Sequence, residues 1–146
     1  MSLHSTIRRI LNEETQKPKI LEFPSLDFFN NNPFEAWKII QKIIEKKGNP
    51  PYSIGGDLDL EGTPIKSLGN LTSVGESLDL RGTPIKSLKN LQSVGGYLNL
   101  YVTPIDSLGN LKSVGEILDL RGTPLSKKYT EEQIREMVNV DGEIYM

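Results

Sequence analysis

The chain has 146 residues, no cysteine, one histidine and a formal net charge of −2. A charge so close to neutral argues against a nucleic-acid partner, and the lack of Cys and His excludes a zinc site or a Ser–His or Cys–His catalytic centre. No apolar run has the length of a signal peptide or a membrane span, so we expect a cytoplasmic or other intracellular protein that binds neither membrane nor cofactor.

Residues 1–32 show the weakest pattern in the chain. A short helical stripe of apolar side chains runs through the first part of this segment, and it comprises Leu3, Ile7, Ile10 and Leu11. The stretches 16–23 and 30–32 have the composition of linkers. We therefore expect an N-terminal extension that is partly flexible.

Residues 33–54 have the features of a helical cap. Asn32 is a good N-cap residue and Pro33 suits the first helical position, so a helix is predicted over 33–47. Its apolar face includes Trp37, which we expect to fill the first repeat. The alternative is that this face binds a partner.

From residue 55 to residue 125 the sequence repeats every twenty residues without a gap. The aligned strings are DLDLEGTPIKSLGNLTSVG (57–75), SLDLRGTPIKSLKNLQSVG (77–95), YLNLYVTPIDSLGNLKSVG (97–115) and ILDLRGTPL (117–125). A fixed period of this length predicts a solenoid, in which each repeat stacks on the next.

Each repeat combines a strand pattern with a returning segment. Leu78 and Leu80 alternate with polar residues, which predicts a strand with one buried face, and Pro84 ends it. The apolar positions after it are spaced by three, which suits a tight return ending in a Ser-Val-Gly corner. One stacked polar column should form a ladder of hydroxyl groups, made of Thr63, Thr83, Thr103 and Thr123. A second should form an inward ladder of amide groups, made of Asn70, Asn90 and Asn110.

The pattern L-x-x-V-x-x-x-L-x-L-x-x-T-x-I-x-x-L resembles the leucine-rich repeat, with Thr83 where that family has Asn. The S-V-G-x-x-L insertion before the strand is similar to the repeats of receptor L-domains. The string IRRILNEE is similar to the start of short leucine-rich proteins of tailed phages. The resemblance covers 52–125 and, more weakly, 139–146. It implies a right-handed α/β solenoid with five parallel strands on one face, used to bind macromolecules, most often proteins.

Residues 126–146 are expected to close the stack. Thr130 and Gln133 have the spacing of a capping box, and the helix after them carries an apolar stripe of Ile134, Met137 and Val138. Residues 139–146 then restore the repeat pattern as a fifth strand. In this strand, Ile144 and Met146 are expected in the core.

This last strand is also expected to form an open sheet edge, because the sequence given ends on it. Unpaired strand edges promote pairing with other chains. We therefore expect that the chain can form a homo-oligomer through an edge made of Glu143, Ile144, Tyr145 and Met146.

Residues that flank the two repeated leucines should point away from the core. The third repeat departs most from the consensus, because it carries Tyr97 and Tyr101 and because Val102 and Asp106 replace repeated residues. Tyrosine and arginine are enriched in binding hot spots. The expected contact residues are Tyr97, Asn99, Tyr101, Arg81 and Arg121, with Tyr145 at the rim. The alternative is that the tyrosines cover the sheet and pair with the arginines across strands.

The repeated aspartates allow a second class of function. Asp79 and Asp119 could pair laterally with the arginines, or could serve as the acids of a carbohydrate-binding or carbohydrate-cleaving solenoid in which the tyrosines stack on sugars. A calcium site is disfavoured, because a flat strand face does not wrap an ion.

The sequence therefore favours a non-enzymatic module that binds a protein, without metal or cofactor. The carbohydrate solenoid is one alternative, and a structural subunit of a larger assembly, such as a viral one, is another.

Overall fold

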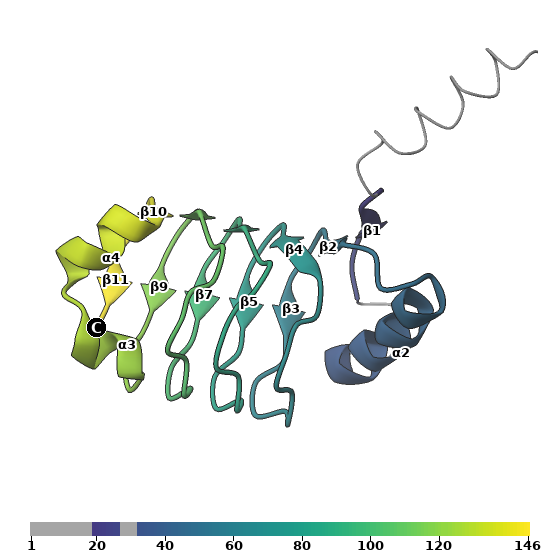
Figure 1. Ribbon diagram of the computed structural model, residues 1–146, viewed down its shortest axis with the longest axis horizontal. Helices are drawn as coiled ribbons and strands as arrows, with labels where there is room; N and C mark the ends of the chain where they lie inside the picture. Colours follow the sequence, from purple (N-terminus) through teal and green to yellow (C-terminus); the bar gives the residue numbers. More distant parts are fainter. Residues whose placement is uncertain (1–18, 27–31) are drawn as a thin grey trace, which may run out of the picture.

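The computed structural model describes residues 19–26 and 32–146, which form two parallel sheets with few helices (Figure 1). The five-stranded sheet has the order β11-β9-β7-β5-β3 and comprises β3 (Leu58–Asp59), β5 (Leu78–Asp79), β7 (Leu98–Asn99), β9 (Leu118–Asp119) and β11 (Ile144–Tyr145). The six-stranded sheet has the order β1-β2-β4-β6-β8-β10 and comprises β1 (Leu21–Phe23), β2 (Tyr52–Ile54), β4 (Leu71–Val74), β6 (Ser93–Val94), β8 (Ser113–Val114) and β10 (Asn139–Val140).

The five-stranded sheet confirms the predicted strand positions and their register. Leu58 pairs with Leu78, Leu78 with Leu98, and Leu98 with Leu118, and all four side chains are fully buried. The column continues to Ile144, although 26 residues rather than twenty separate it from Leu118. Identical side chains thus meet their own copies in the next repeat, which lets one apolar pattern build a continuous core.

The six-stranded sheet is a correction to the sequence analysis, which expected only a corner at each Ser-Val-Gly. Val74 pairs with Val94 and Val94 with Val114 in parallel register, and the three valines are buried. The glycine after each valine donates its N–H to the preceding strand of this sheet: Gly95 to the Val74 carbonyl and Gly115 to the Val94 carbonyl, both at 2.9 Å, and Gly75 to the Ile54 carbonyl at 2.7 Å. Because each return must satisfy its backbone polar groups, the corner extends into a second sheet.

Helix α2 (Pro33–Lys46) confirms the predicted N-terminal helix to within one residue. Asn32 caps it by accepting a hydrogen bond from the Glu35 N–H at 3.2 Å. Trp37 is half-buried and packs against the hydrophobic core, stacked on Phe34 with ring centroids 6.3 Å apart. The fully buried residues of α2 are Ala36, Ile40 and Ile44.

Residues 21–23 are a second correction, because they were expected to be linker and form β1. This strand pairs in parallel with β2, with Leu21 opposite Tyr52 and Phe23 opposite Ile54. Three residues are too few to show a clear period, so their strand character arises from the partner strand. The predicted apolar stripe of residues 3–11 lies outside the described residues, as does most of the extension expected to be flexible.

Two helices, α3 (Pro124–Lys128) and α4 (Glu131–Met137), precede the final strands. The capping box of α4 is confirmed, with both Thr130–Gln133 hydrogen bonds present. Met146 was assigned wrongly to the core, because it is 37% exposed, whereas Ile144 is buried. In the predicted apolar stripe, Ile134 and Val138 are buried and Met137 is 46% exposed. In the described ranges, no helix is long and apolar enough to cross a lipid bilayer.

The polar columns exist, but their bonding differs from the prediction. Each threonine hydroxyl donates to the leucine carbonyl three residues earlier in its own repeat, as Thr83 does to Leu80 at 2.8 Å, so the threonines form no ladder between repeats. Asn90 and Asn110 are exposed and Asn70 is half-buried, so the asparagines do not form an inward column, although Asn90 does donate to Asn70 across repeats at 2.9 Å. A hydroxyl bonded within its own turn stabilises that turn.

Candidate binding surface on the five-stranded sheet

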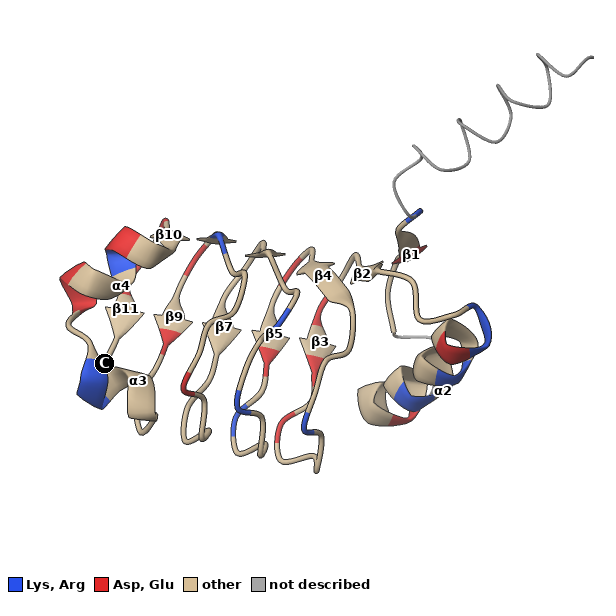
Figure 2. Ribbon diagram, in the orientation of Figure 1, with Lys and Arg blue, Asp and Glu red and all other residues tan. Residues whose placement is uncertain are grey.

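The outward side chains of the five-stranded sheet form one surface, here called the strand face. The face consists of Asp57, Asp59, Glu61, Ser77, Asp79, Arg81, Tyr97, Asn99, Tyr101, Ile117, Asp119, Arg121, Glu143 and Tyr145. Acidic positions recur at β3, β5 and β9 along this sheet, with β7 as the interruption (Figure 2). Tyr97 and Tyr101 are 42% and 43% exposed, so the third repeat presents the largest open apolar groups of the face.

The aspartate of the second repeat is held by its own arginine. Arg81 Nε donates to both carboxylate oxygens of Asp79 at 3.0 Å, and Arg81 Nη2 donates to Asp79 Oδ2 at 2.8 Å. The same Nη2 reaches Glu61 Oε2 of the preceding repeat at 2.9 Å. Asp79 is thereby only 7% exposed, and its charge is compensated at the surface.

The fourth repeat contains the same pair, with tyrosines added on both sides. Arg121 Nε and Nη2 donate to the two oxygens of Asp119 at 3.0 and 2.7 Å. The guanidinium carbon lies 5.4 Å from the ring centroid of Tyr101 and 5.1 Å from that of Tyr145. Three neighbouring strands thus contribute to one stack of Tyr101, Arg121 and Tyr145, and cation–π attraction adds to the ion pair.

These contacts decide how the predicted site residues are arranged. The expected cross-strand pairing of tyrosine with arginine is confirmed for Arg121, whereas Arg81 binds carboxylates. The expected pairing of the aspartates with Arg81 and Arg121 is confirmed, and each aspartate binds the arginine two residues later in its own repeat. An aspartate and an arginine two apart in a strand point to the same side, which explains the pairing.

Tyr97 stands between two shallow hollows of the strand face. One has a volume of about 130 Å³ and lies toward β3, beside Asp57, Asp59 and Asp79. The other has a volume of about 170 Å³ and lies toward β11, beside Ile117 and Tyr145. One aromatic ring therefore separates an acidic hollow from a more apolar one.

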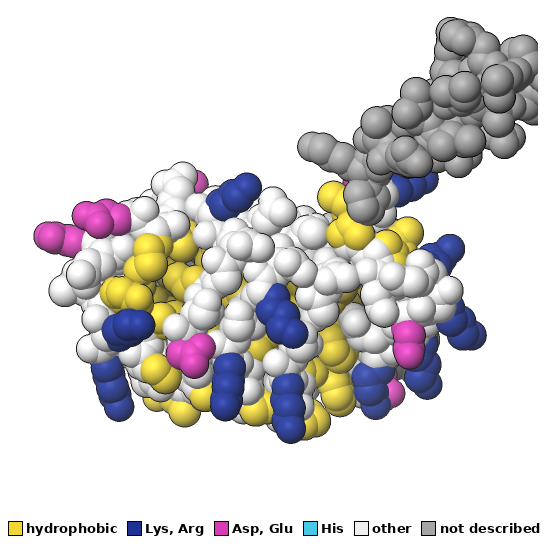
Figure 3. Space-filling view, viewed as in Figure 1, with side chains coloured by type: hydrophobic (Ala, Val, Ile, Leu, Met, Phe, Trp, Pro, Cys, Tyr) yellow, Lys and Arg dark blue, Asp and Glu magenta, His cyan; other side chains and the backbone are white. Residues whose placement is uncertain are grey.

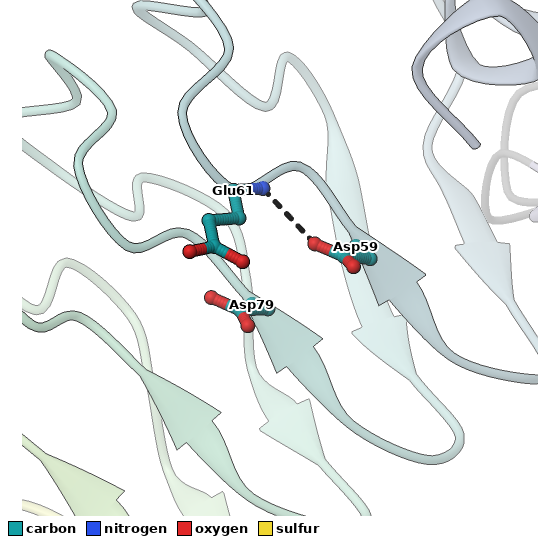
Figure 4. Close-up of side chains that lie close together, drawn as sticks. All are labelled: Asp59, Glu61 and Asp79. Atoms are coloured by element: carbon teal, nitrogen blue, oxygen red, sulfur yellow. Dashed lines mark hydrogen bonds between the residues drawn. The ribbon is translucent and has the colours of Figure 1, made fainter. Parts of the chain in front are cut away.

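Asp59, Glu61 and Asp79 place one carboxylate oxygen each within 4.8 Å of one another (Figure 4). Asp59 is already engaged, because its Oδ1 accepts the Glu61 N–H at 3.1 Å. Arg81 bonds to both Glu61 and Asp79, so a guanidinium compensates the charge of this cluster.

Electrostatic contacts also shift pKa values on this face. Hydrogen bonding to Asp79 raises the pKa of Arg81, and hydrogen bonding to Asp119 does the same for Arg121, so both arginines stay charged. A hydrogen bond with Glu143 and its negative charge raise the pKa of Tyr145. The Tyr145 hydroxyl is thereby kept in its neutral form to higher pH.

The proposed self-association edge occupies the outer position of the five-stranded sheet. The carbonyls of Glu143 and Tyr145 accept hydrogen bonds from Leu118 and Leu120 of the preceding repeat, at 3.0 and 2.7 Å. Ile144 points into the core, while Glu143, Tyr145 and Met146 are exposed.

Two features of the surface were not among the predicted site residues. An apolar hollow of about 300 Å³ opens beside α4, lined in part by Leu108, Tyr129 and Met137 (Figure 3). The hollow arises after β9, where α3 and α4 take the place of the return segment of the earlier repeats. The repeat pattern does not extend to these helices. The second feature is Val102, which is 53% exposed and directly follows Tyr101. The sequence does distinguish this position, because the other three repeats have glycine where the third repeat has valine.

Comparisons with protein-family models, with curated proteins and with solved structures find no match to this chain.

Proposed function

We propose that this chain is a right-handed, leucine-rich-repeat-like solenoid that acts as a non-enzymatic module binding a protein partner through its strand face. The observation that carries this proposal is the stack of Tyr101, Arg121 and Tyr145 beside Tyr97. Tyrosine and arginine give large contact areas and several hydrogen-bond donors, and both are enriched where proteins bind tightly.

The rigidity of the face supports binding rather than simple surface cover. Arg121 is fixed by Asp119 from below and by two rings from the sides, so little side-chain entropy is lost when a partner covers it. The strip is short, because five strands about 4.8 Å apart span roughly 20 Å. A standard interface buries about 800 Å² per partner, so the partner must also contact neighbouring turns.

The charge of the face favours a basic partner. Asp57, Asp59 and Glu143 are exposed, whereas both arginines of the face are engaged by carboxylates. A partner carrying lysine or arginine would therefore be attracted to the end formed by β3, and its association rate should fall as ionic strength rises.

The carbohydrate alternative has one observation in its favour, the exposure of Tyr97 and Tyr101, since open rings can stack on sugars. A cleaving enzyme is disfavoured by the state of the proposed acids. Asp79 and Asp119 are nearly buried, and their oxygens accept hydrogen bonds from arginine, so they are poorly placed to reach a glycosidic bond.

A random-peptide display selection and a glycan array, both against the full chain, test the proposal. We expect peptides that contain lysine or arginine and that bind Tyr101→Ala at least tenfold more weakly than the wild type. Met137→Ala is the control, because it removes an exposed apolar side chain outside the strand face. Glycan binding that is lost in Tyr97→Ala would instead support the carbohydrate alternative, and selected peptides indifferent to Tyr101→Ala would contradict the proposal.

The proposal includes self-association through residues 143–146. It also includes an intracellular location, which is in keeping with the absence of cysteine. Sedimentation at rising concentration tests the first point. A monomer at all concentrations removes it, while large stable assemblies without an external ligand would favour the structural-subunit alternative.

A further inference from the structure

The turn that follows each strand of the repeats requires a left-handed residue at one fixed position. Glycine occupies this position in three repeats, with φ of +67° at Gly62, +67° at Gly82 and +74° at Gly122. The third repeat has Val102 there instead, with φ of +53°. A β-branched residue in this region is a true outlier, because its side chain crowds the backbone.

Packing does not explain the valine. Its side chain is 53% exposed, so less than half of its surface is removed from water. Its main neighbour is the next turn, where a Cβ atom added at Gly122 would lie 3.2 Å from Val102 Cγ2. Backbone strain of this kind clusters at functional sites.

We propose that Val102 is a contact residue, and that the partner of the strand face also covers the turn after β7 and places an apolar side chain on Val102. This inference rests on the proposed function and extends it. Val102 directly follows Tyr101, whose ring contacts Arg121, so the turn continues the strand face without a gap. The hollow beside the turn has a volume of about 480 Å³ and is lined by Pro104, Pro124 and Lys127, which gives room for a partner side chain.

The chain contains its own control for backbone strain. Lys89 is a second non-glycine residue in the left-handed region, with φ of +48°, where the neighbouring repeats have Gly69 and Gly109. It lies within the return segment and does not belong to the strand face. Lys89→Gly should therefore relieve backbone strain and leave every partner contact in place. Val102→Gly should relieve backbone strain and also remove a partner contact.

Thermal unfolding of the full chain tests the strain. We expect the unfolding midpoint to rise by about 3–6 °C in Val102→Gly, and to rise also in Val102→Asn, because asparagine tolerates the left-handed region. The reverse change, Gly82→Val, should lower the midpoint, since a Cβ atom there has no neighbour closer than 4.0 Å and backbone strain alone acts. A midpoint that is unchanged or lower in both Val102 variants overturns the inference.

Peptides obtained from the display selection, chosen for their loss of affinity on Tyr101→Ala, test the contact. We expect both Val102 variants to bind these peptides five- to tenfold more weakly and Lys89→Gly to bind them as the wild type does. Replacing one apolar peptide residue by alanine should weaken binding to the wild type but not to Val102→Gly, which identifies the group on Val102. If Tyr101→Ala weakens binding and the Val102 variants do not, the inference fails and the proposed function stands. If the selection yields no peptide sensitive to Tyr101→Ala, both fail.

Discussion

At the scale of single residues, Tyr52 links the N-terminal helix to the first repeat. Its ring is fully buried, and its hydroxyl donates to the Leu68 carbonyl at 2.6 Å while accepting from Gln41 Nε2 at 3.0 Å. Burial raises its pKa to about 12. A phenol enclosed in this way is stabilising as long as it stays neutral.

Alkaline pH should therefore destabilise the chain through Tyr52. Because the pKa is about 12 in the folded chain and 10.0 in its unfolded reference, this contribution is complete below pH 10 and falls as pH rises through 12. We expect Tyr52→Phe to cost about 1–2 kcal/mol at neutral pH, through loss of its hydrogen bonds, and to flatten the alkaline decline. Urea unfolding between pH 7 and pH 11 measures both effects. Tyr97→Phe serves as the control for loss of an exposed hydroxyl, and an equal decline in Tyr52→Phe and the wild type would contradict the assignment.

At the scale of the element, the second sheet depends on how closely the backbones approach one another. Gly75, Gly95 and Gly115 follow the buried valines, and a Cβ atom at any of them would overlap the carbonyl oxygen of the equivalent glycine one repeat earlier. The six-stranded sheet thus requires glycine for space rather than for an unusual dihedral angle.

Gly95→Ala should accordingly disrupt the pairing of β4 with β6. The added methyl group would meet backbone, which cannot move aside without breaking the Gly95–Val74 hydrogen bond, so we expect a loss of about 3 kcal/mol in the free energy of unfolding. Gly56→Ala is the matched control, because its nearest neighbours would lie at an ordinary 3.6 Å. Equal stabilities of the two variants in a denaturant titration would show that the sheet can open to admit a side chain.

The sequence predicts the elements unevenly, for physical reasons. The alternation of Leu78 and Leu80 identifies a strand with one buried face, and Asn32 followed by Pro33 identifies the start of α2. The second sheet escapes prediction because β6, β8 and β10 each contribute one buried valine, and a single buried position shows no alternation. On the strand face, the alternation identifies which side chains point outward. Whether Arg81 contacts a tyrosine or a carboxylate depends on distances between side chains, and the spacing of residues in the sequence does not determine these distances.

At the scale of the whole molecule, each repeat packs mainly on its neighbours, and helices close the two ends of the stack (Figure 1). The C-terminal end depends on α4, whose Ile134 is fully buried. Arg135 adds hydrogen bonds to the carbonyls of Val140 and Gly142, both at 3.0 Å, and so ties α4 to the final strands. A repeat array of this kind can unfold from one end, since the loss of a terminal unit exposes only the next one.

Loosening α4 should therefore accelerate opening locally rather than everywhere. We expect Ile134→Ala, which leaves a cavity costing about 2–4 kcal/mol, to speed hydrogen exchange at the amides of Leu118, Leu120 and Asn139, which bond to residues of neighbouring repeats near this end. The amide of Leu58, bonded to Ser77 at the other end, should retain its wild-type rate. Met137→Ala truncates an exposed residue of the same helix and controls for its helical propensity. Exchange that quickens by the same factor at both ends would mean that the two sheets couple the repeats into a single cooperative unit, because the cavity at α4 would then weaken β3 as much as β9.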